Sequence, residues 1–150
     1  MTFKNITELL DFAIQKEEQA AKFYTDLAKK TNSGSMRKVF EDFAREELGH
    51  KAKLIGIKNG KVLAIPSSKV MDLKIAEQVG DVEPGPEMTY QQALVLAMKR
   101  EKSSFKLYNE LANITDNDGI RGTMLLLAQE EAKHKLWFEI EYDDYVLQEN

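Results

Sequence analysis

One pattern of charged residues occurs twice in this chain and constrains its fold more than any other feature. In the first copy Glu17 precedes Glu47-Leu48-Gly49-His50, and in the second Glu101 precedes Glu131-Ala132-Lys133-His134. The lone glutamate stands the same 30 positions before its tetrapeptide in both copies (17 to 47 and 101 to 131). Such equal spacing indicates a duplicated unit, so we expect two homologous halves related by a pseudo-two-fold axis.

Apolar residues around each copy recur with the period of an α-helix. The three prolines all fall between positions 66 and 86, and each proline-free stretch that remains is long enough for a pair of helices. Polar and small residues predict turns at Thr31–Ser35 and Asp116–Gly119, and Thr89 is the expected N-cap of the third helix. We therefore predict an all-α fold with helical hairpins over about 5–58 and 89–145.

The segment between the hairpins, about 59–88, is too long for a tight turn. Its length favours a long crossover between the second and third helices of a four-helix bundle. A short helix is expected within it over Ser67–Val79, where several apolar residues recur. The whole chain, 1–150, is expected to form one domain, because its length suffices for one core and not for two.

The composition excludes several classes of function. A net charge of −4 provides no basic surface of the kind that binds nucleic acid or an anionic membrane. There are no cysteines, which excludes disulfides, iron–sulfur clusters and a four-thiolate iron site within this chain. No apolar stretch is long enough to span a bilayer and the N-terminus does not read as a signal peptide, so a cytoplasmic location is expected.

The glutamates of the doubled pattern lie on otherwise apolar stripes, where carboxylates are normally excluded. Four buried carboxylates are costly without compensation, and no lysine or arginine is expected on the inward stripes to pair with them. Two divalent cations would neutralise all four, and carboxylate and imidazole donors suit iron or manganese. This donor set is that of a two-metal site in a four-helix bundle. The predicted ligands are Glu17, Glu47, His50, Glu101, Glu131 and His134.

Four further residues repeat beside the predicted ligands. Tyr24 and Tyr108 lie two helical turns beyond the lone glutamate of each copy, on the same face. Their hydroxyls are predicted to bond to ligand carboxylates, and plain packing of core aromatics is the alternative. Glu46 and Glu130 stand four residues before each histidine. They are candidates for hydrogen bonds to the outer imidazole nitrogens, with a surface contact along the helix as the alternative.

These residues resemble the iron-binding helices of the rubrerythrin-like branch of the ferritin-like di-iron superfamily. The resemblance rests on Glu17-Glu18-Gln19-Ala20 with Tyr24, on the two Glu-x-x-His pairs, and on Glu101 with Tyr108, and it covers about residues 5–145. It implies two iron ions, with manganese as an alternative, and the reduction of hydrogen peroxide or dioxygen. An external electron donor, such as a rubredoxin-like protein, would be required. A bundle of this size is expected to form a homo-oligomer, most simply a dimer.

The chain departs from its nearest families at two positions. Rubrerythrins typically carry an extra glutamate one turn after the ligand on the third helix, where this chain has Ser104. Bacterioferritins hold haem through a methionine at the position of Leu48, so no haem is expected. Two other functions stay open. One is iron oxidation or storage without peroxidase turnover, and the other is a metal-binding bundle that acts through a protein partner.

Overall fold

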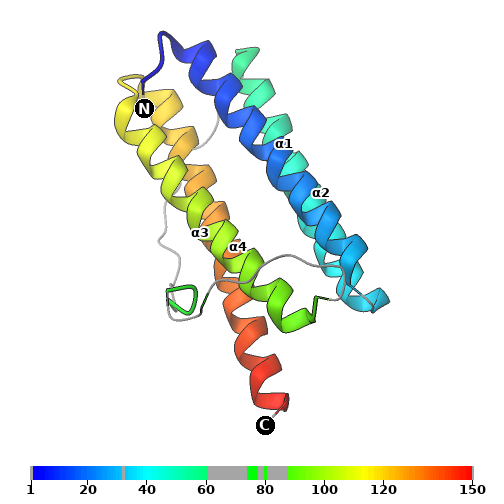
Figure 1. The fold of residues 1–150 in the computed structure, drawn as a ribbon. Coiled ribbons are helices and arrows are strands. Elements are labelled where there is room, and N and C mark those ends of the chain that lie inside the picture. The colour runs from blue at the N-terminus through cyan, green and yellow to red at the C-terminus, as the bar shows by residue number, and fades with distance from the viewer. Residues whose placement is uncertain (1, 32, 61–73, 78–79, 81–87, 150) are drawn as a thin grey trace.

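The computed structural model describes residues 2–31, 33–60, 74–77, 80 and 88–149. Four helices make up the structure: α1 (Ile6–Lys30), α2 (Gly34–Lys58), α3 (Tyr90–Ile114) and α4 (Asp118–Glu149). The described segments contain no strand. Figure 1 shows the four helices side by side along a common axis. The predicted all-α four-helix bundle is confirmed.

Short polar residues begin the helices. The Asn5 side chain accepts a hydrogen bond from the backbone N–H of Glu8 at the start of α1. Thr89 and Gln92 form a reciprocal capping box at the start of α3, which confirms the predicted cap. The Asn117 side chain accepts from the N–H of Ile120 in the first turn of α4. These bonds satisfy backbone donors that a helix leaves unpaired at its start.

The helices pair as two hairpins, with α1 against α2 and α3 against α4. Helix α2 ends at the opposite end of the bundle from the start of α3 (Figure 1), so these two helices run parallel. No tight turn joins parallel helices end to end, which agrees with the predicted crossover. Most of the short helix expected over 67–79 lies outside the described residues.

Helix α4 continues to Glu149, beyond the end expected near residue 145. The extension projects past the other helices at one end of the bundle (Figure 1). Tyr142 and Tyr145 pack against the core, and the Tyr145 ring lies edge-on to that of Tyr90 at 5.4 Å between centroids. Tyr90 also donates a hydrogen bond from its hydroxyl to Glu141. These contacts fix the helix as far as residue 145.

Two apolar layers fill the bundle on either side of its middle. One layer contains Tyr24, Phe40 and Phe138, and the other contains Leu54 and Leu127, all 2% exposed or less. Burial of each such side chain contributes about 1.5–3 kcal/mol to folding. The layers leave a middle zone between them, where the lone glutamates of α1 and α3 and the Glu-x-x-His pairs of α2 and α4 fall.

The pseudo-symmetry of the hairpins is broken at one ion pair. In the first hairpin Lys51 pairs with Glu18, with 2.8 Å between Nζ and Oε1. The counterpart of Glu18 in the second hairpin is Lys102, which cannot pair with Lys135, the counterpart of Lys51. Glu77 of the crossover lies between these two lysines instead, at 3.2 Å from Lys102 Nζ and 3.8 Å from Lys135 Nζ. The crossover thus supplies the negative charge that α3 lacks.

A buried carboxylate holds the same part of the crossover. Glu139 is 0% exposed and its Oε2 accepts hydrogen bonds from the backbone N–H groups of Ile75 and Ala76 at 2.7 and 3.1 Å. The same oxygen lies 3.1 Å from Lys135 Nζ. Lys135 is only 4% exposed, so one lysine does face inward, and it pairs with Glu139, which is not a predicted ligand. The ammonium group is tolerated there because Glu139 and Glu77 pair with it.

Candidate metal centre

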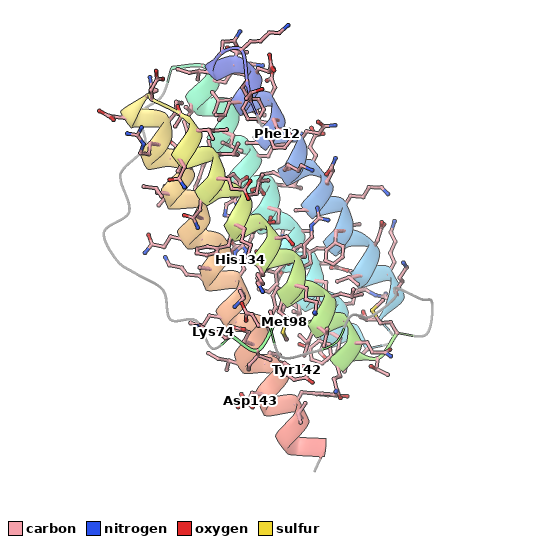
Figure 2. The ribbon with its side chains drawn as sticks, turned by 60° about the vertical axis from the view of Figure 1, so that its left-hand side comes forward. Phe12, Lys74, Met98, His134, Tyr142 and Asp143 are labelled. Carbon is pink, nitrogen blue, oxygen red and sulfur yellow. The ribbon has the colours of Figure 1, made fainter. Side chains whose placement is uncertain are left out.

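The six predicted ligands lie together in the middle zone of the bundle. Each helix contributes at least one of them: α1 and α3 one glutamate each, α2 and α4 one Glu-x-x-His pair each. None of the six is more than 7% exposed. Figure 2 shows His134 between Phe12, towards one end of the bundle, and Met98, towards the other. The antiparallel hairpins bring the lone glutamates level with the pairs because both hairpins have the same spacing.

The two histidines point their Nδ1 atoms into this cluster. His50 Nδ1 lies 2.8 Å from Glu131 Oε1 and 3.6 Å from Glu17 Oε1. His134 Nδ1 lies 3.2 Å from Glu47 Oε1 and 3.5 Å from Glu101 Oε1. Each histidine therefore approaches carboxylates of both hairpins. The imidazole rings are nearly parallel, with 5.5 Å between their centroids.

The potential ligand atoms form two overlapping groups. Within each group the ligand atoms lie within 4.8 Å of one another, so one ion could contact all of them. Glu47 and Glu131 belong to both groups. The first group is completed by Glu17 and His50, and the second by Glu101 and His134. Two sites that share two carboxylates are the arrangement expected of a di-metal centre.

Unpaired polar atoms concentrate in the same cluster. Among the described residues, eight buried side-chain nitrogen or oxygen atoms have no hydrogen-bond partner, and seven of them belong to the six predicted ligands. A buried polar atom without a partner costs about 1–3 kcal/mol. Carboxylate oxygens and imidazole nitrogens are the donors that iron, manganese or zinc accepts. The residues present therefore fit a pair of divalent metal ions.

Protons partly offset the negative charge of this cluster in the protein chain alone. Burial, together with repulsion from Glu101, raises the pKa of both Glu131 and Glu47 well above the usual value. Burial lowers the pKa of His134, but the close approach of the Glu101 and Glu47 carboxylates outweighs it and raises the pKa to about 11. Burial also acts to raise the pKa of Glu101, but the close approach of Glu131 and His134 outweighs it, and the pKa is lowered.

Two tyrosines connect α1 and α3 beside the cluster. The Tyr24 hydroxyl donates a hydrogen bond to Glu101 Oε1, and the Tyr108 hydroxyl donates to Glu17 Oε1. Burial and the neighbouring carboxylates raise the pKa of both phenols well above the usual value, so both remain protonated donors. Each tyrosine thus supports the lone glutamate of the other hairpin.

Glu46 and Glu130 lie at the outer edge of the cluster. Glu46 Oε2 is 3.6 Å from Nε2 of His134, a distance too long for a hydrogen bond. Glu130 accepts a hydrogen bond from Lys133 at 3.4 Å. In the described part of the chain, neither glutamate hydrogen-bonds to the histidine of its own helix. Helices α2 and α4 face each other here, so Glu46 approaches the histidine of the opposite hairpin.

An open pocket of about 480 Å³ lies beside this edge. His50 and Gly49 line it, together with charged residues of α2 and with Glu130 of α4.

Sequence reasoning also missed Phe43, whose ring packs edge-on against that of His134 with 5.0 Å between centroids. The sequence does place Phe43 on the inward apolar stripe of α2, which could have indicated a contact with the ligands.

The described helices include no segment with the length and apolarity needed to cross a bilayer.

Comparison with known proteins agrees with this geometry. The profile of the Rubrerythrin family matches residues 8–65 and 92–150. The crystal structure of an uncharacterised conserved protein from Magnetospirillum magnetotacticum MS-1 is similar, with a TM-score of 0.71 and 25% identity, over 93% of this chain and 95% of that one. A hypothetical protein from Pyrococcus furiosus shares the fold, with a TM-score of 0.63 and 23% identity over 93% and 89% of the two chains. No curated protein matches the chain. Because the family profile covers most of its length, the chain belongs to the Rubrerythrin family.

Proposed function

We propose that this protein is a di-iron redox protein that reduces hydrogen peroxide or dioxygen with electrons from an external donor. The observation that carries the proposal is the buried cluster of four carboxylates and two imidazoles with unpaired atoms. Glu47 and Glu131 would bridge the two ions, because they belong to both ligand groups. Glu17 and Glu101 would be terminal ligands, and His50 and His134 would give one nitrogen to each ion.

A reduced two-iron centre supplies the two electrons that, with two protons, convert hydrogen peroxide into two water molecules. The chain's own residues would hold and isolate this chemistry. The apolar layers on both sides keep bulk water from the ligands. Tyr24 and Tyr108 orient the terminal carboxylates by donating hydrogen bonds to them. None of these roles depends on the extra glutamate that Ser104 replaces.

The electron donor would be a separate protein or domain, because this chain has no cysteine with which to hold a thiolate iron centre. A rubredoxin-like protein is the proposed donor. We further propose a homodimer located in the cytoplasm. Iron is proposed over manganese because the chain belongs to the Rubrerythrin family.

The test begins with anaerobic loading of metal-free protein with Fe(II) and a count of iron per chain. The loaded protein is then mixed with hydrogen peroxide, or with air-saturated buffer, in a stopped-flow spectrometer. About two irons per chain and rapid oxidation that a reductant reverses are the expected results. Glu131→Gln should lose the metal, whereas Glu41→Gln, which removes an equal charge from an exposed site on α2, should not.

Two outcomes would contradict the proposal. Hundreds of irons per particle on size exclusion would show storage. A loaded protein that does not react with either oxidant would exclude redox turnover and favour a metal-binding bundle that acts through a partner.

A further inference from the structure

Most routes from solvent to the ligand cluster are closed by buried side chains. The apolar layers cover the cluster along the axis of the bundle in both directions. Helices α1 and α2, and likewise α3 and α4, pack directly on each other. Tyr24 and Tyr108, at most 1% exposed, cross between α1 and α3 on the remaining long side. Among the described residues, this leaves the side between α2 and α4.

The open pocket described above lies on that side. His50, only 2% exposed, lines the pocket and also has its Nδ1 atom in the ligand cluster. Gly49 contributes no side chain, and a Cβ placed there would meet no atom within 4 Å. The pocket therefore reaches a ligand side chain without an intervening apolar layer.

A third group of potential metal ligands is found at this mouth. One oxygen of Glu46 and one ring nitrogen from each of His50 and His134 lie within 4.8 Å of one another. The exposed fraction falls from 58% for the Glu46 side chain to 9% for His134 and 3% for His50. Glu46 is thus the outermost member of a continuous series of donors that ends at the buried carboxylates.

The other charges around the mouth leave Glu46 available to a cation. Asp42 is paired with Lys38 and Arg45 on its own helix, and Glu130 is paired with Lys133. Within the described segments, the approach of Glu46 Oε2 to a positively charged or ring nitrogen is the 3.6 Å distance to His134 Nε2, which is too long for a hydrogen bond. Lys53 also lines the pocket, and its charge opposes cation entry.

From this arrangement we propose that divalent metal ions enter the centre between α2 and α4, and that Glu46 captures them first, beside His50 and His134. This inference rests on the proposed metal centre and adds the route by which that centre is loaded. The ion would then move inward to the Nδ1 atoms of the two histidines and the buried carboxylates. Glu46 then governs the rate of loading rather than the final affinity, because it is absent from both inner groups.

The test measures the kinetics of metal binding rather than turnover. Metal-free protein is mixed with Co(II), whose visible absorption reports coordination, at low ionic strength and without oxygen. Glu46→Gln should lower the association rate constant about tenfold, as expected for losing one negative charge close to the path of a dication. The equilibrium affinity and a stoichiometry of two per chain should stay unchanged. Glu41→Gln is the matched control, with the same charge change on the same helix.

A steric variant tests the route without altering charge. Gly49→Met should fold, because its Cβ has open space and glycine is a poor helix former. Its side chain would narrow the pocket and slow Co(II) association while leaving the affinity unchanged.

Association of Glu46→Gln at the wild-type rate would overturn the proposal. So would an unchanged association rate with faster dissociation, which would make Glu46 a support for bound His134 instead. If wild-type protein bound no Co(II) at equilibrium, the proposed metal centre itself would fail and the route with it.

Discussion

Loading metal into this centre should expel protons from it. In the metal-free chain His134 has a pKa of about 11, so at pH 7 its imidazole is protonated almost completely. A metal ion cannot bind Nδ1 until a proton leaves the ring, which accounts for one proton per chain. The pKa values of Glu47 and Glu131 are also raised, by burial and by Glu101, so any protons that they hold would add to this release. For each proton released, the apparent affinity should rise about tenfold per pH unit.

Isothermal titration calorimetry measures this release. Mn(II) is titrated into metal-free protein at pH 7 in buffers that differ in ionisation enthalpy, such as phosphate and Tris. The observed heat should vary linearly with that enthalpy, with a slope of about one proton per chain or more. A chelator of known proton release, titrated in the same buffers, calibrates the slope. If the heat did not depend on the buffer, metal binding would not displace protons from these ligands, and the prediction would be refuted.

Three further predictions concern the chain itself. The pKa of His134 is raised from 6.5 to about 11 in the folded protein, so its contribution to stability is full below about pH 6.5 and is lost as the pH rises through 11. The melting temperature of metal-free protein, followed by circular dichroism, should therefore fall between pH 7 and 10. A constant melting temperature would contradict this. Tyr24→Phe leaves a buried ligand carboxylate without its donor, so metal affinity should fall about 10- to 100-fold in a competition assay with a chelator, whereas Tyr142→Phe, away from the cluster, should leave it unchanged. Glu139→Leu removes one carboxylate partner of the buried Lys135 and the acceptor of two crossover N–H groups, and we expect a loss of about 3–5 kcal/mol in urea unfolding, partly recovered when Glu139→Leu is combined with Lys135→Met; equal losses in the single and double variants would show that the pair is not coupled.

Helical periodicity and duplicated spacing were enough to predict the bundle and the residues at its centre. Glu17 and Glu101 meet the Glu-x-x-His pairs because both hairpins turn at equivalent places, and a period of 3.6 keeps the ligands on the inward face. Thr89 was recognised as a cap because capping depends on residues three apart in sequence. Local rules of this kind act within a single helix or hairpin.

Features that depend on long-range packing were not recognised. Glu139 lies eight residues after Glu131 on the same face, but its partners are backbone N–H groups of the crossover, whose path no periodicity encodes. The approach of Glu46 to His134 depends on which helices face each other across the bundle. The packing of Tyr142 and Tyr145 of α4 against the core depends on residues of other helices.

The near-equivalence of the hairpins also bears on how such a protein could arise. Every predicted ligand has a counterpart in the other half, so a chain of half this length could have built the same centre from two identical copies. After fusion of those copies, the two halves could change independently of each other. Position 102 is an example of such a change. Lys102 prevents a counterpart of the ion pair that Glu18 and Lys51 form in the first half, and it pairs instead with Glu77 of the crossover, which therefore binds to only one half. A single charge reversal thereby distinguishes the second hairpin from the first.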